Sequence, residues 1–424
     1  MNVAVVGLGK IGVPLAVQFA SKGATVAGYD VDPARVDAIN ARRNPLRGEP
    51  GLDEMLPSAV ASGRLRATAD ARDAVADAEA VVLIVPVDIG PSHQPDFTLL
   101  DAAVDAVAPH LRRGVLVIVE TTVPVGTTRG RVGARIAAAS GFAPTTDFSL
   151  AFSPERVSSG TVLRDLRIYP KVVGGIDAHS AARATQFYRS LLDAEVMALR
   201  DAETAEFSKL AETTYRDVNI ALANEFARIG DRLGVDALQA IEASNTQPYS
   251  HIHTPGAGVG GHCIPVYPYF LADAQAELIP AARRINDDMA GYAVARLARA
   301  LRTIDGATVV VLGLAYRANV KEWRHSSAFG LASALGGAGA RVYVHDPLFT
   351  AEEVRACGLE PPPTFPLAAD ALAVQAWHDA YRPDGRCAID FAKFPGLRAV
   401  LDGRAVLDPA AVEGAGIAYV GVGR

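Results

Sequence analysis

The sequence predicts an α/β protein in which two parallel, doubly wound sheets are joined by a long central helix. Strand and helix patterns alternate between residues 3 and 152, and a shorter alternation returns between residues 308 and 407. Residues 201–233 lie between them, contain no proline and carry apolar residues at helical spacing. A chain of 424 residues is long enough for two or three domains. We expect three, at 1–196, 197–300 and 301–424.

The composition argues against several classes of protein. The net charge of −6 provides no general basic surface for nucleic acid or an anionic membrane, and no apolar run reaches the ~18–20 residues that span a bilayer. The cysteines Cys263, Cys357 and Cys387 lack metal-ligand spacing, so we expect a reduced, cytoplasmic protein without a metal site. The N-terminal apolar run breaks at Gly7 with no basic region before it, which indicates a strand rather than a signal peptide.

The first strand pattern, residues 3–6, runs directly into a glycine-rich turn and a helix pattern over residues 13–21. Gly7 permits the tight turn, Gly9 lets a pyrophosphate approach the backbone, and Gly12 lets the helix pack on the strand. The free N–H groups at the start of the helix suit phosphate. The predicted cofactor loop consists of Gly7, Gly9, Lys10, Ile11 and Gly12.

A second strand pattern, residues 25–29, ends in Asp30, which follows Gly7 by 23 residues. A carboxylate at about this distance bonds the ribose hydroxyls of a dinucleotide and repels a 2′-phosphate. The sequence therefore predicts a Rossmann-like domain that binds NAD, while Arg35 leaves NADP open as an alternative.

Further candidate site residues follow the next two predicted strands. Residues 80–85 form a strand pattern that ends at Pro86, and residues 115–119 form one that leads to two threonines. Ligands collect at the carboxyl ends of strands in doubly wound sheets, so these positions are expected to bind cofactor or a catalytic water. They are Val85, Pro86, Thr121 and Thr122.

Another strand pattern, residues 150–152, is followed by Ser153-Pro154-Glu155-Arg156. A carboxylate at a strand end is a candidate general base, and a solvated surface charge is the alternative. Thr127 and Thr128 are expected to cap a helix rather than to bind a ligand.

The central region is predicted to be helical. Residues 201–233 predict one helix of about 50 Å, which suits a connection between two domains. Its apolar stripe could also bury a second subunit, so we expect at least a homodimer. Lys209 lies on this helix, where a solvated lysine is the alternative to a functional one. Further helices are expected over residues 235–244 and 281–304.

A glycine-rich loop between these two helices ends in Cys263. Its glycines leave little side chain near the backbone, which permits positive φ and close approach of a ligand. They are Gly256, Gly258, Gly260 and Gly261. A thiol presented in this way is a candidate nucleophile, and a small buried hydrophobe is the alternative.

The last part repeats the first in shorter form. A strand over residues 308–313, a helix over 326–336 and a strand over 341–344 are followed by short strands at 399–400 and 405–407. There is no full GxGxxG, so we expect a nucleotide diphosphate rather than a dinucleotide. Candidate phosphate ligands, with surface charge as the alternative, are Arg317, Arg324 and Arg404.

Seven motifs in fixed order resemble the nucleotide-sugar dehydrogenase family, which includes UDP-glucose and GDP-mannose dehydrogenases. They are GLGKIG at Gly7, ETTVPVGTT at Glu120, SPERV at Ser153, EFSKLAETTYRDVNIALANE at Glu206, GVGGHCIP at Gly258, GLAYRANVKEWRHSS at Gly313 and LDGRAVLD at Leu401. The forms SPERV, YRDVNIALANE and VGGHCIP most resemble the UDP-N-acetylhexosamine branch, above all the UDP-N-acetylmannosamine 6-dehydrogenases.

The resemblance implies a two-step, four-electron oxidation, with NAD, of the C6 alcohol of a UDP-sugar to a uronic acid. Cys263 would hold the aldehyde as a thiohemiacetal and then as a thioester that water hydrolyses. Lys209 would stabilise the oxyanion, Glu155 would serve as base, and Thr122 would hold a water near the alcohol. The substrate-binding residues implied are Glu155, Arg156, Lys209, Thr213, Arg216, Gly258, Gly260, Tyr316, Arg317 and Arg404. Arg324 falls where the family has an arginine that faces NAD.

The chain departs from the family pattern near the thiol. Tyr267 stands where the family has Asp, Thr213 where it has Asn, and His325 where it has Glu. Slower chemistry, a different sugar or oxidation that stops at the aldehyde are therefore hypotheses.

Three other functions are weighed. They are UDP-glucose 6-dehydrogenase, a nucleotide-sugar-binding protein whose site has drifted, and a one-step alcohol dehydrogenase. Retention of Cys263, Lys209 and Glu155 argues against drift, and the cysteine loop argues against a one-step enzyme.

Overall fold

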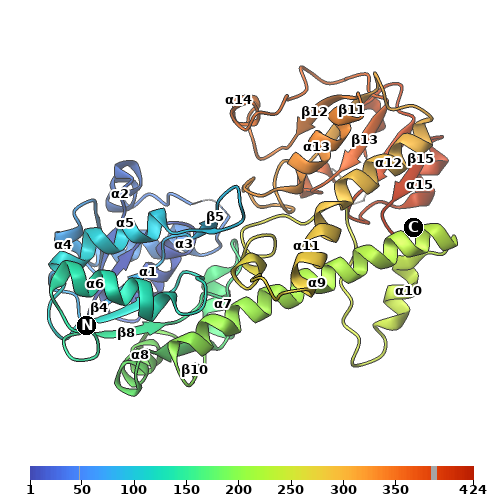
Figure 1. Cartoon of the computed structure of the whole chain (residues 1–424). Coiled ribbons are helices and arrows are strands. Elements are labelled where there is room, and N and C mark those ends of the chain that lie inside the picture. Colours follow the sequence, from blue (N-terminus) through green and yellow to red (C-terminus); the bar gives the residue numbers. More distant parts are fainter. Residues whose placement is uncertain (47, 383–388) are drawn as a thin grey trace. The chain divides into compact units, whose positions relative to one another are not determined.

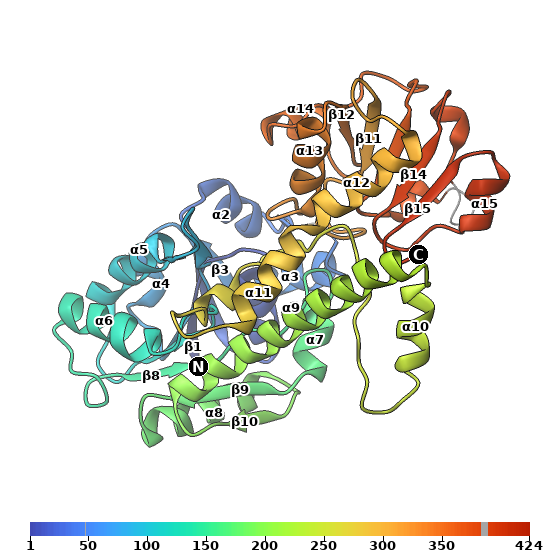
Figure 2. The same ribbon diagram turned by 45° about the vertical axis from the view of Figure 1, so that its right-hand side comes forward.

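The computed structural model describes residues 1–46, 48–382 and 389–424. Two compact units are present, one of residues 1–212 with 269–271 and one of residues 213–268 with 272–424. Each contains a sheet with helices packed on it (Figures 1 and 2), which confirms the predicted α/β class. The three functional regions expected from the sequence stay a prediction.

The first unit is built on an eight-stranded sheet in the order β10-β9-β8-β7-β4-β1-β2-β3. Neighbouring strands are parallel except β8 and β9, which are antiparallel. The chain order reverses between β1 and β4, which is where a doubly wound sheet binds its ligand. The strands are β1 (Asn2–Val6), β2 (Thr25–Tyr29), β3 (Leu65–Thr68), β4 (Ala80–Leu83), β7 (Leu116–Val119), β8 (Ser149–Phe152), β9 (Lys171–Gly175) and β10 (Val196–Ala198).

Helices and short elements complete this unit. The α-helices are α1 (Gly12–Ser21), α2 (Pro33–Asn40), α3 (Leu52–Ala61), α4 (Ala71–Val75), α5 (Thr98–Val107), α6 (Gly133–Ser140), α7 (Val162–Ile168) and α8 (Ala178–Leu191). The short elements are β5 (Asp88–Ile89), β6 (Pro95–Asp96), η1 (Ala108–His110) and the π-helical η2 (Thr127–Val132).

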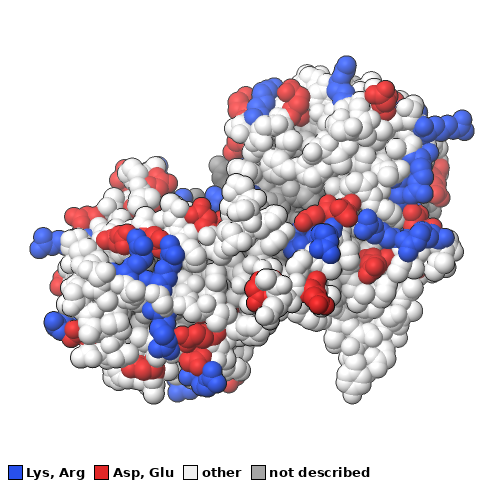
Figure 3. Space-filling view, in the orientation of Figure 1, with Lys and Arg blue, Asp and Glu red and all other residues white. Residues whose placement is uncertain are grey.

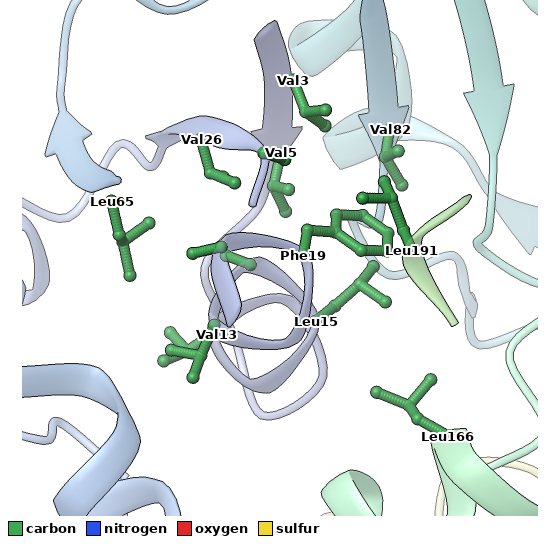
Figure 4. Close-up of a cluster of buried hydrophobic side chains, with 14 of the residues drawn as sticks. Val3, Val5, Val13, Leu15, Phe19, Val26, Leu65, Val82, Leu166 and Leu191 are labelled. Carbon is green, nitrogen blue, oxygen red and sulfur yellow. The ribbon is translucent and has the colours of Figure 1, made fainter. Parts of the chain in front are cut away.

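Helix α1 is held to the sheet by apolar packing. Figure 4 shows the ring of Phe19 beside Val82 of β4 and Leu191 of α8. Phe19 is fully buried and meets the ring of Phe187 edge to face, with 5.4 Å between centroids. Burial of one such ring stabilises the fold by ~1.5–3 kcal/mol. This packing fixes the N-terminus of α1 at the end of β1, where the glycine loop lies.

The central helix α9 (Ala202–Leu233) is a single helix of 32 residues (Figure 1), as predicted. Asp201 caps its first turn, because its carboxylate accepts a hydrogen bond from the backbone N–H of Thr204 at 2.8 Å. Hydrogen bonds from the Thr204 hydroxyl and backbone lower the pKa of Asp201 to about 2. Gly234, with φ of +69°, ends the helix.

The second unit contains a five-stranded parallel sheet in the order β12-β11-β13-β14-β15. Its strands are β11 (Thr308–Leu312), β12 (Arg341–His345), β13 (Ala371–Val374), β14 (Ala399–Asp402) and β15 (Ala418–Gly421). The remaining helices of the chain are α10 (Ala237–Ser244), η3 (Tyr267–Phe270), α11 (Leu278–Asp287), α12 (Met289–Leu301), α13 (Ser327–Gly337), α14 (Ala351–Ala356), η4 (Asp379–Tyr381), η5 (Phe391–Lys393) and α15 (Pro409–Gly414).

One predicted element is right in part and one is wrong. The helix expected over 281–304 is present, but as two consecutive helices, α11 and α12, that meet at Asp288. The strand expected over 405–407 is a turn, because the Asp402 carboxylate accepts hydrogen bonds from the backbone N–H groups of Val406 and Leu407, each at 2.8 Å. Ala405 also has a φ of +54°, which no strand residue adopts.

The expected caps at Thr127 and Thr128 are also wrong. Glu206 of α9 caps η2 instead, since its carboxylate accepts hydrogen bonds from the backbone N–H groups of Gly126 and Thr128. Glu206 is fully buried, and burial raises its pKa despite these hydrogen bonds.

Acidic and basic side chains alternate on the face of the molecule in Figure 3. Ion pairs within the first unit include Arg131 Nε at 2.8 Å from Asp101 and Arg129 Nε at 2.6 Å from Glu203. Among the described helices, none combines the length and hydropathy that a bilayer crossing requires. Cys387 lies outside the described residues.

Candidate functional site

The glycine loop between β1 and α1 has the geometry that the fingerprint predicts. Gly7 has a φ of +98°, and a Cβ there would lie 2.8 Å from the carbonyl oxygen of Ile84. A Cβ on Gly12 would overlap the carbonyl oxygen of Gly7, whereas a Cβ on Gly9 would meet nothing within 4 Å. The loop therefore closes tightly on the strands and leaves its backbone open at Gly9.

Asp30 is fixed at the end of β2. Its Oδ2 accepts hydrogen bonds from the backbone N–H of Leu8 at 2.8 Å and from Arg35 Nη1 at 3.0 Å. The Asp30 side chain is 7 % exposed. A carboxylate aligned with the glycine loop and an open backbone at Gly9 fit the ribose and pyrophosphate of NAD.

The residues after β4 and β7 meet at the same sheet edge. The hydroxyl of Thr121 donates to the carbonyl oxygen of Val85 at 2.7 Å, and Thr122 beside it is buried. Ile11 packs on the core, while Lys10 is exposed. Of the predicted NAD-binding set, the structure thus brings together the members from the first unit. Arg324 belongs to the second unit, so its role toward NAD stays a prediction.

Glu155 lies at the end of β8 in a buried charged cluster. Its Oε2 lies 2.9 Å from Lys171 Nζ, and its Oε1 accepts from the backbone N–H of Arg156 at 2.7 Å. Lys171 Nζ also lies 3.2 Å from Oε1 of Glu120, which accepts a hydrogen bond from the hydroxyl of Tyr188. Burial raises the pKa of Glu155, but Lys171, the backbone N–H of Arg156 and Lys209 together outweigh burial, and the net shift is downward.

Lys209 is buried on α9 in the same unit, and its positive charge also lowers the pKa of Glu155. Arg156 reaches α9 as well, with its Nε 2.8 Å from Glu212. Thr213, the next residue of the helix, is buried. The structure therefore places Glu155 and Lys209, the predicted base and the predicted oxyanion stabiliser, in one charged cluster.

The cysteine loop belongs to the second unit. A Cβ on Gly258 would lie 2.7 Å from the Cβ of Ser327, and one on Gly261 would lie 3.1 Å from the ring of Tyr316. The absence of side chains thus lets the Tyr316 ring and the start of α13 approach the loop. Cys263 is half-buried, and its carbonyl oxygen accepts from the backbone N–H of Tyr267 at 2.9 Å. It therefore does not lie in an apolar core.

Arg404 holds this loop in place. Its guanidinium donates to three oxygens: the carbonyl of Gln375 at 2.6 Å, the carbonyl of Gly258 at 3.0 Å, and the hydroxyl of Ser327 at 2.7 Å. Burial lowers the pKa of Arg404 to about 10. Arg404 thus supports the cysteine loop directly, a contact that the sequence did not suggest.

Tyr316 lies close to several of the residues predicted to bind substrate. Its pKa is raised by burial and, more weakly, by the charge of Cys263, while Arg317 and Arg216 act in the opposite direction. The guanidinium carbon of Arg317 lies 5.8 Å from the centre of the Tyr316 ring. Tyr316, Arg216, Arg317 and Cys263 therefore lie in one region of the second unit.

The sequence analysis missed Lys171, Glu120 and Tyr188. Lys171 begins a short strand pattern after Pro170, and Tyr188 lies in an ordinary amphipathic helix, so neither has a local signal. The position of Glu120 directly after a strand and before the two threonines was the one available clue.

Comparison with known proteins shows the family to which the chain belongs. Residues 1–192, 203–288 and 310–409 match the NAD binding domain, the central domain and the UDP binding domain of the UDP-glucose/GDP-mannose dehydrogenase family. A UDP-N-acetyl-D-mannosamine dehydrogenase of Pyrococcus horikoshii is 38% identical over 354 residues, which cover 82% of this chain and 84% of the relative.

One further relative and one solved structure agree. An NDP-N-acetyl-D-galactosaminuronic acid dehydrogenase of Ralstonia solanacearum is 37% identical over 77% of this chain and 78% of its own. The solved structure of the UDP-D-ManNAc dehydrogenase of Pyrococcus horikoshii has a TM-score of 0.88 and 33% identity, and covers 100% of this chain and 99% of that one. The chain therefore belongs to the UDP-glucose/GDP-mannose dehydrogenase family and is an NAD-dependent nucleotide-sugar dehydrogenase.

Proposed function

We propose that the protein oxidises the C6 alcohol of a UDP-N-acetylhexosamine, such as UDP-ManNAc or UDP-GlcNAc, to the uronic acid. The observation that carries this proposal is the half-buried Cys263 on a glycine loop that packs against Tyr316 in the UDP-binding unit. The relatives named for N-acetylated sugars support the choice of substrate.

The residues have distinct roles in this proposal. The glycine loop and Asp30 hold NAD, which when bound accepts a hydride in each of the two oxidations. The thiolate of Cys263 adds to the C6 aldehyde carbon and keeps the intermediate on the enzyme. Lys209 stabilises the negative charge that develops on the C6 oxygen. Thr122 holds a water near the alcohol.

Hydrolysis completes the reaction. Water attacks the thioester carbon of the second intermediate, and Glu155 accepts the proton that this water loses. The carbon–sulfur bond then breaks, which releases the uronic acid and returns Cys263 as a thiolate. This step needs Cys263 beside Glu155 and Lys209, and their meeting in one active site is part of the proposal.

Most of the proposed substrate-binding residues belong to the second unit, and Arg156 belongs to the first. Tyr316, Arg317 and Arg216 contact the uridine diphosphate end, with Arg404 supporting the loop behind it. Arg156, Thr213, Gly258 and Gly260 contact the sugar end, and Arg324 faces NAD. Tyr267 and Thr213, which replace a family Asp and Asn, make oxidation that stops at the aldehyde the main alternative course, and UDP-glucose is the alternative sugar.

A panel of UDP-sugars tests the proposal. The purified protein is incubated with NAD and each sugar, NADH is followed by absorbance, and products are identified by mass. Release of two NADH per N-acetylhexosamine supports full oxidation, and one NADH indicates a halt at the aldehyde. No NADH with any sugar contradicts the proposal, and preference for UDP-glucose contradicts the choice of sugar.

We also propose that two copies of the chain pair through α9 in the cytoplasm. Three large apolar side chains at heptad-like spacing on this helix are exposed: Phe207 (53%), Tyr215 (55%) and Leu222 (42%). A stripe of this kind suits a second copy of the same helix. Light scattering of the purified protein should give twice the chain mass, and Leu222→Glu should shift it toward the monomer. A wild-type monomer contradicts the pairing.

A further inference from the structure

The charged cluster behind Glu155 contains groups to which the proposed reaction assigns no role. Lys171 at the start of β9 is 4 % exposed and lies between two carboxylates, Glu155 at the end of β8 and Glu120 at the end of β7. The backbone N–H of Glu155 also donates to the carbonyl oxygen of Glu120 at 3.3 Å. The strand ends thus fix the three side chains relative to one another within one unit.

Lys171, Glu155 and Glu120, which contact one another directly, hold an uneven number of charges. Two ionised carboxylates and one ammonium leave one surplus negative charge among these three, and an uncompensated buried charge is costly. The positive charge of Lys209, the weakest of the influences named above on Glu155, offsets only part of it. A single added proton makes the three side chains neutral. Glu120 is the deeper carboxylate, with no exposure against 12 % for Glu155, and this burial favours its neutral form even though the hydroxyl of Tyr188 donates to it.

The two carboxylates respond differently to this environment. Burial raises the pKa of Glu120 to about 7, although Lys171 opposes the shift. For Glu155, Lys171 acts together with the backbone N–H of Arg156 and with Lys209, their combined effect exceeds that of burial, and the pKa falls. The proton that neutralises the cluster therefore goes to Glu120 rather than to Glu155.

We propose that Lys171 and Glu120 are positioning residues for Glu155: Lys171 fixes its carboxylate as an ion, and Glu120 takes the surplus proton of the cluster. A base that must accept a proton from water has to be ionised when the thioester forms. The hydrogen bonds from Lys171 and from the backbone of Arg156 also fix the plane of the carboxylate. This inference rests on the proposed function, in which Glu155 activates the hydrolytic water.

Other groups near Glu155 bear on its ionisation. Lys209 of α9 adds a second positive charge, and Asp165 of α7 lines the same small cavity as Glu155. Tyr188 of α8 faces both Glu120 and Lys171, whose ammonium lies 4.9 Å from the centre of its ring. With these other groups constant, substitution of Lys171 should raise the pKa of Glu155, whereas substitution of the protonated Glu120 by Gln should leave it nearly unchanged.

The test uses the full-length chain with NAD and UDP-N-acetyl-D-mannosamine. In Lys171→Met, thioester hydrolysis should slow at least about tenfold. NADH then appears as a burst followed by slow turnover, and intact mass shows a sugar nucleotide attached at Cys263. The acid limb of kcat should move to higher pH in Lys171→Met and stay close to that of the wild type in Glu120→Gln, because Glu120 is already neutral where Glu155 titrates. Lys171→Arg, which keeps the charge, should restore most of the hydrolysis rate.

A double variant controls for the possibility that Lys171→Met acts by destabilising the fold. Glu120→Gln with Lys171→Met removes both charges, so no unpaired ammonium or extra carboxylate remains, and Glu155 still loses its counter-charge. If the double variant melts like the wild type yet accumulates no adduct and keeps the wild-type acid limb, the inference is wrong.

The inference can also fail separately from the proposed function. Absence of NADH with the wild-type protein refutes the proposed function alone. Carbon-13 NMR of labelled glutamate carboxyls then decides the inference, with Glu155 assigned from Glu155→Gln. The Glu155 signal should titrate below the ordinary range of a glutamate in the wild type and at higher pH in Lys171→Met, and equal titration in both overturns it.

Discussion

Substitutions of Gly9 and Gly12, the second and third glycines of the loop between β1 and α1, allow effects on fold stability to be separated from effects on NAD binding. In Gly12→Ala the new methyl would overlap the carbonyl oxygen of Gly7 and lie 3.3 Å from Ile84 Cγ2. Backbone must move to relieve this overlap, at a cost of ~1–3 kcal/mol. In a unit of this size ~1 kcal/mol corresponds to ~2–4 °C, so Tm should fall by ~2–12 °C. NAD affinity should fall as well, because Gly7 is displaced.

Gly9→Ala is the matched variant. Its methyl would meet nothing within 4 Å, and no positive φ is required, so stability should change by less than ~0.5 kcal/mol. The methyl nevertheless projects where the pyrophosphate must approach the backbone, and NAD affinity should fall at least about tenfold. Thermal melting and calorimetric titration with NAD measure both quantities. Wild-type affinity in Gly9→Ala, or wild-type stability in Gly12→Ala, refutes this account of the loop.

Three further predictions concern single charged groups. Asp30→Asn keeps acceptors for the Leu8 N–H but removes the charge, so the ratio of kcat/KM for NAD to that for NADP should fall about tenfold, and an unchanged ratio contradicts the role of Asp30. Arg404→Lys cannot keep all three hydrogen bonds to Gln375, Gly258 and Ser327, so UDP-sugar KM should rise severalfold with NAD affinity unaltered. Glu120 has a folded-state pKa of about 7 against an ordinary 4.5, so its contribution to stability is full below pH 4.5 and is lost as pH rises through 7. The Tm of Glu120→Gln minus that of the wild type should therefore increase from pH 5 to pH 8, and a constant difference argues against the protonated Glu120.

The sequence predicted best those elements whose local residue pattern also determines their place in the fold. The turn from Gly7 to Gly12 requires glycine for steric reasons that are visible in the spacing alone, and the structure reproduces them. Helix α9 was predicted because 32 residues of consistent periodicity leave no competing interpretation. By contrast, α11 and α12 meet at Asp288, where neither that residue nor its two neighbours is proline or glycine, so the division of residues 281–304 could not be predicted from the sequence.

The parts of the site that were missed depend on contacts between distant residues. Lys171 and Glu120 are 51 positions apart in the chain and meet only because β7, β8 and β9 are neighbours in the sheet. The cap of η2 by Glu206 is likewise supplied by another element, so the threonines at its start did not reveal it. Arg404 was expected to bind phosphate, and only the structure shows its hydrogen bond to the carbonyl of Gly258.

The central claim is that Cys263 carries the sugar through both oxidations. Mass spectrometry of Glu155→Gln after incubation with NAD and UDP-N-acetyl-D-mannosamine tests it most directly, because hydrolysis is blocked while the earlier steps can proceed. The account predicts a uronyl nucleotide attached to the peptide that contains Cys263, and loss of turnover in Cys263→Ala. An unmodified peptide together with full turnover in Cys263→Ala would contradict it.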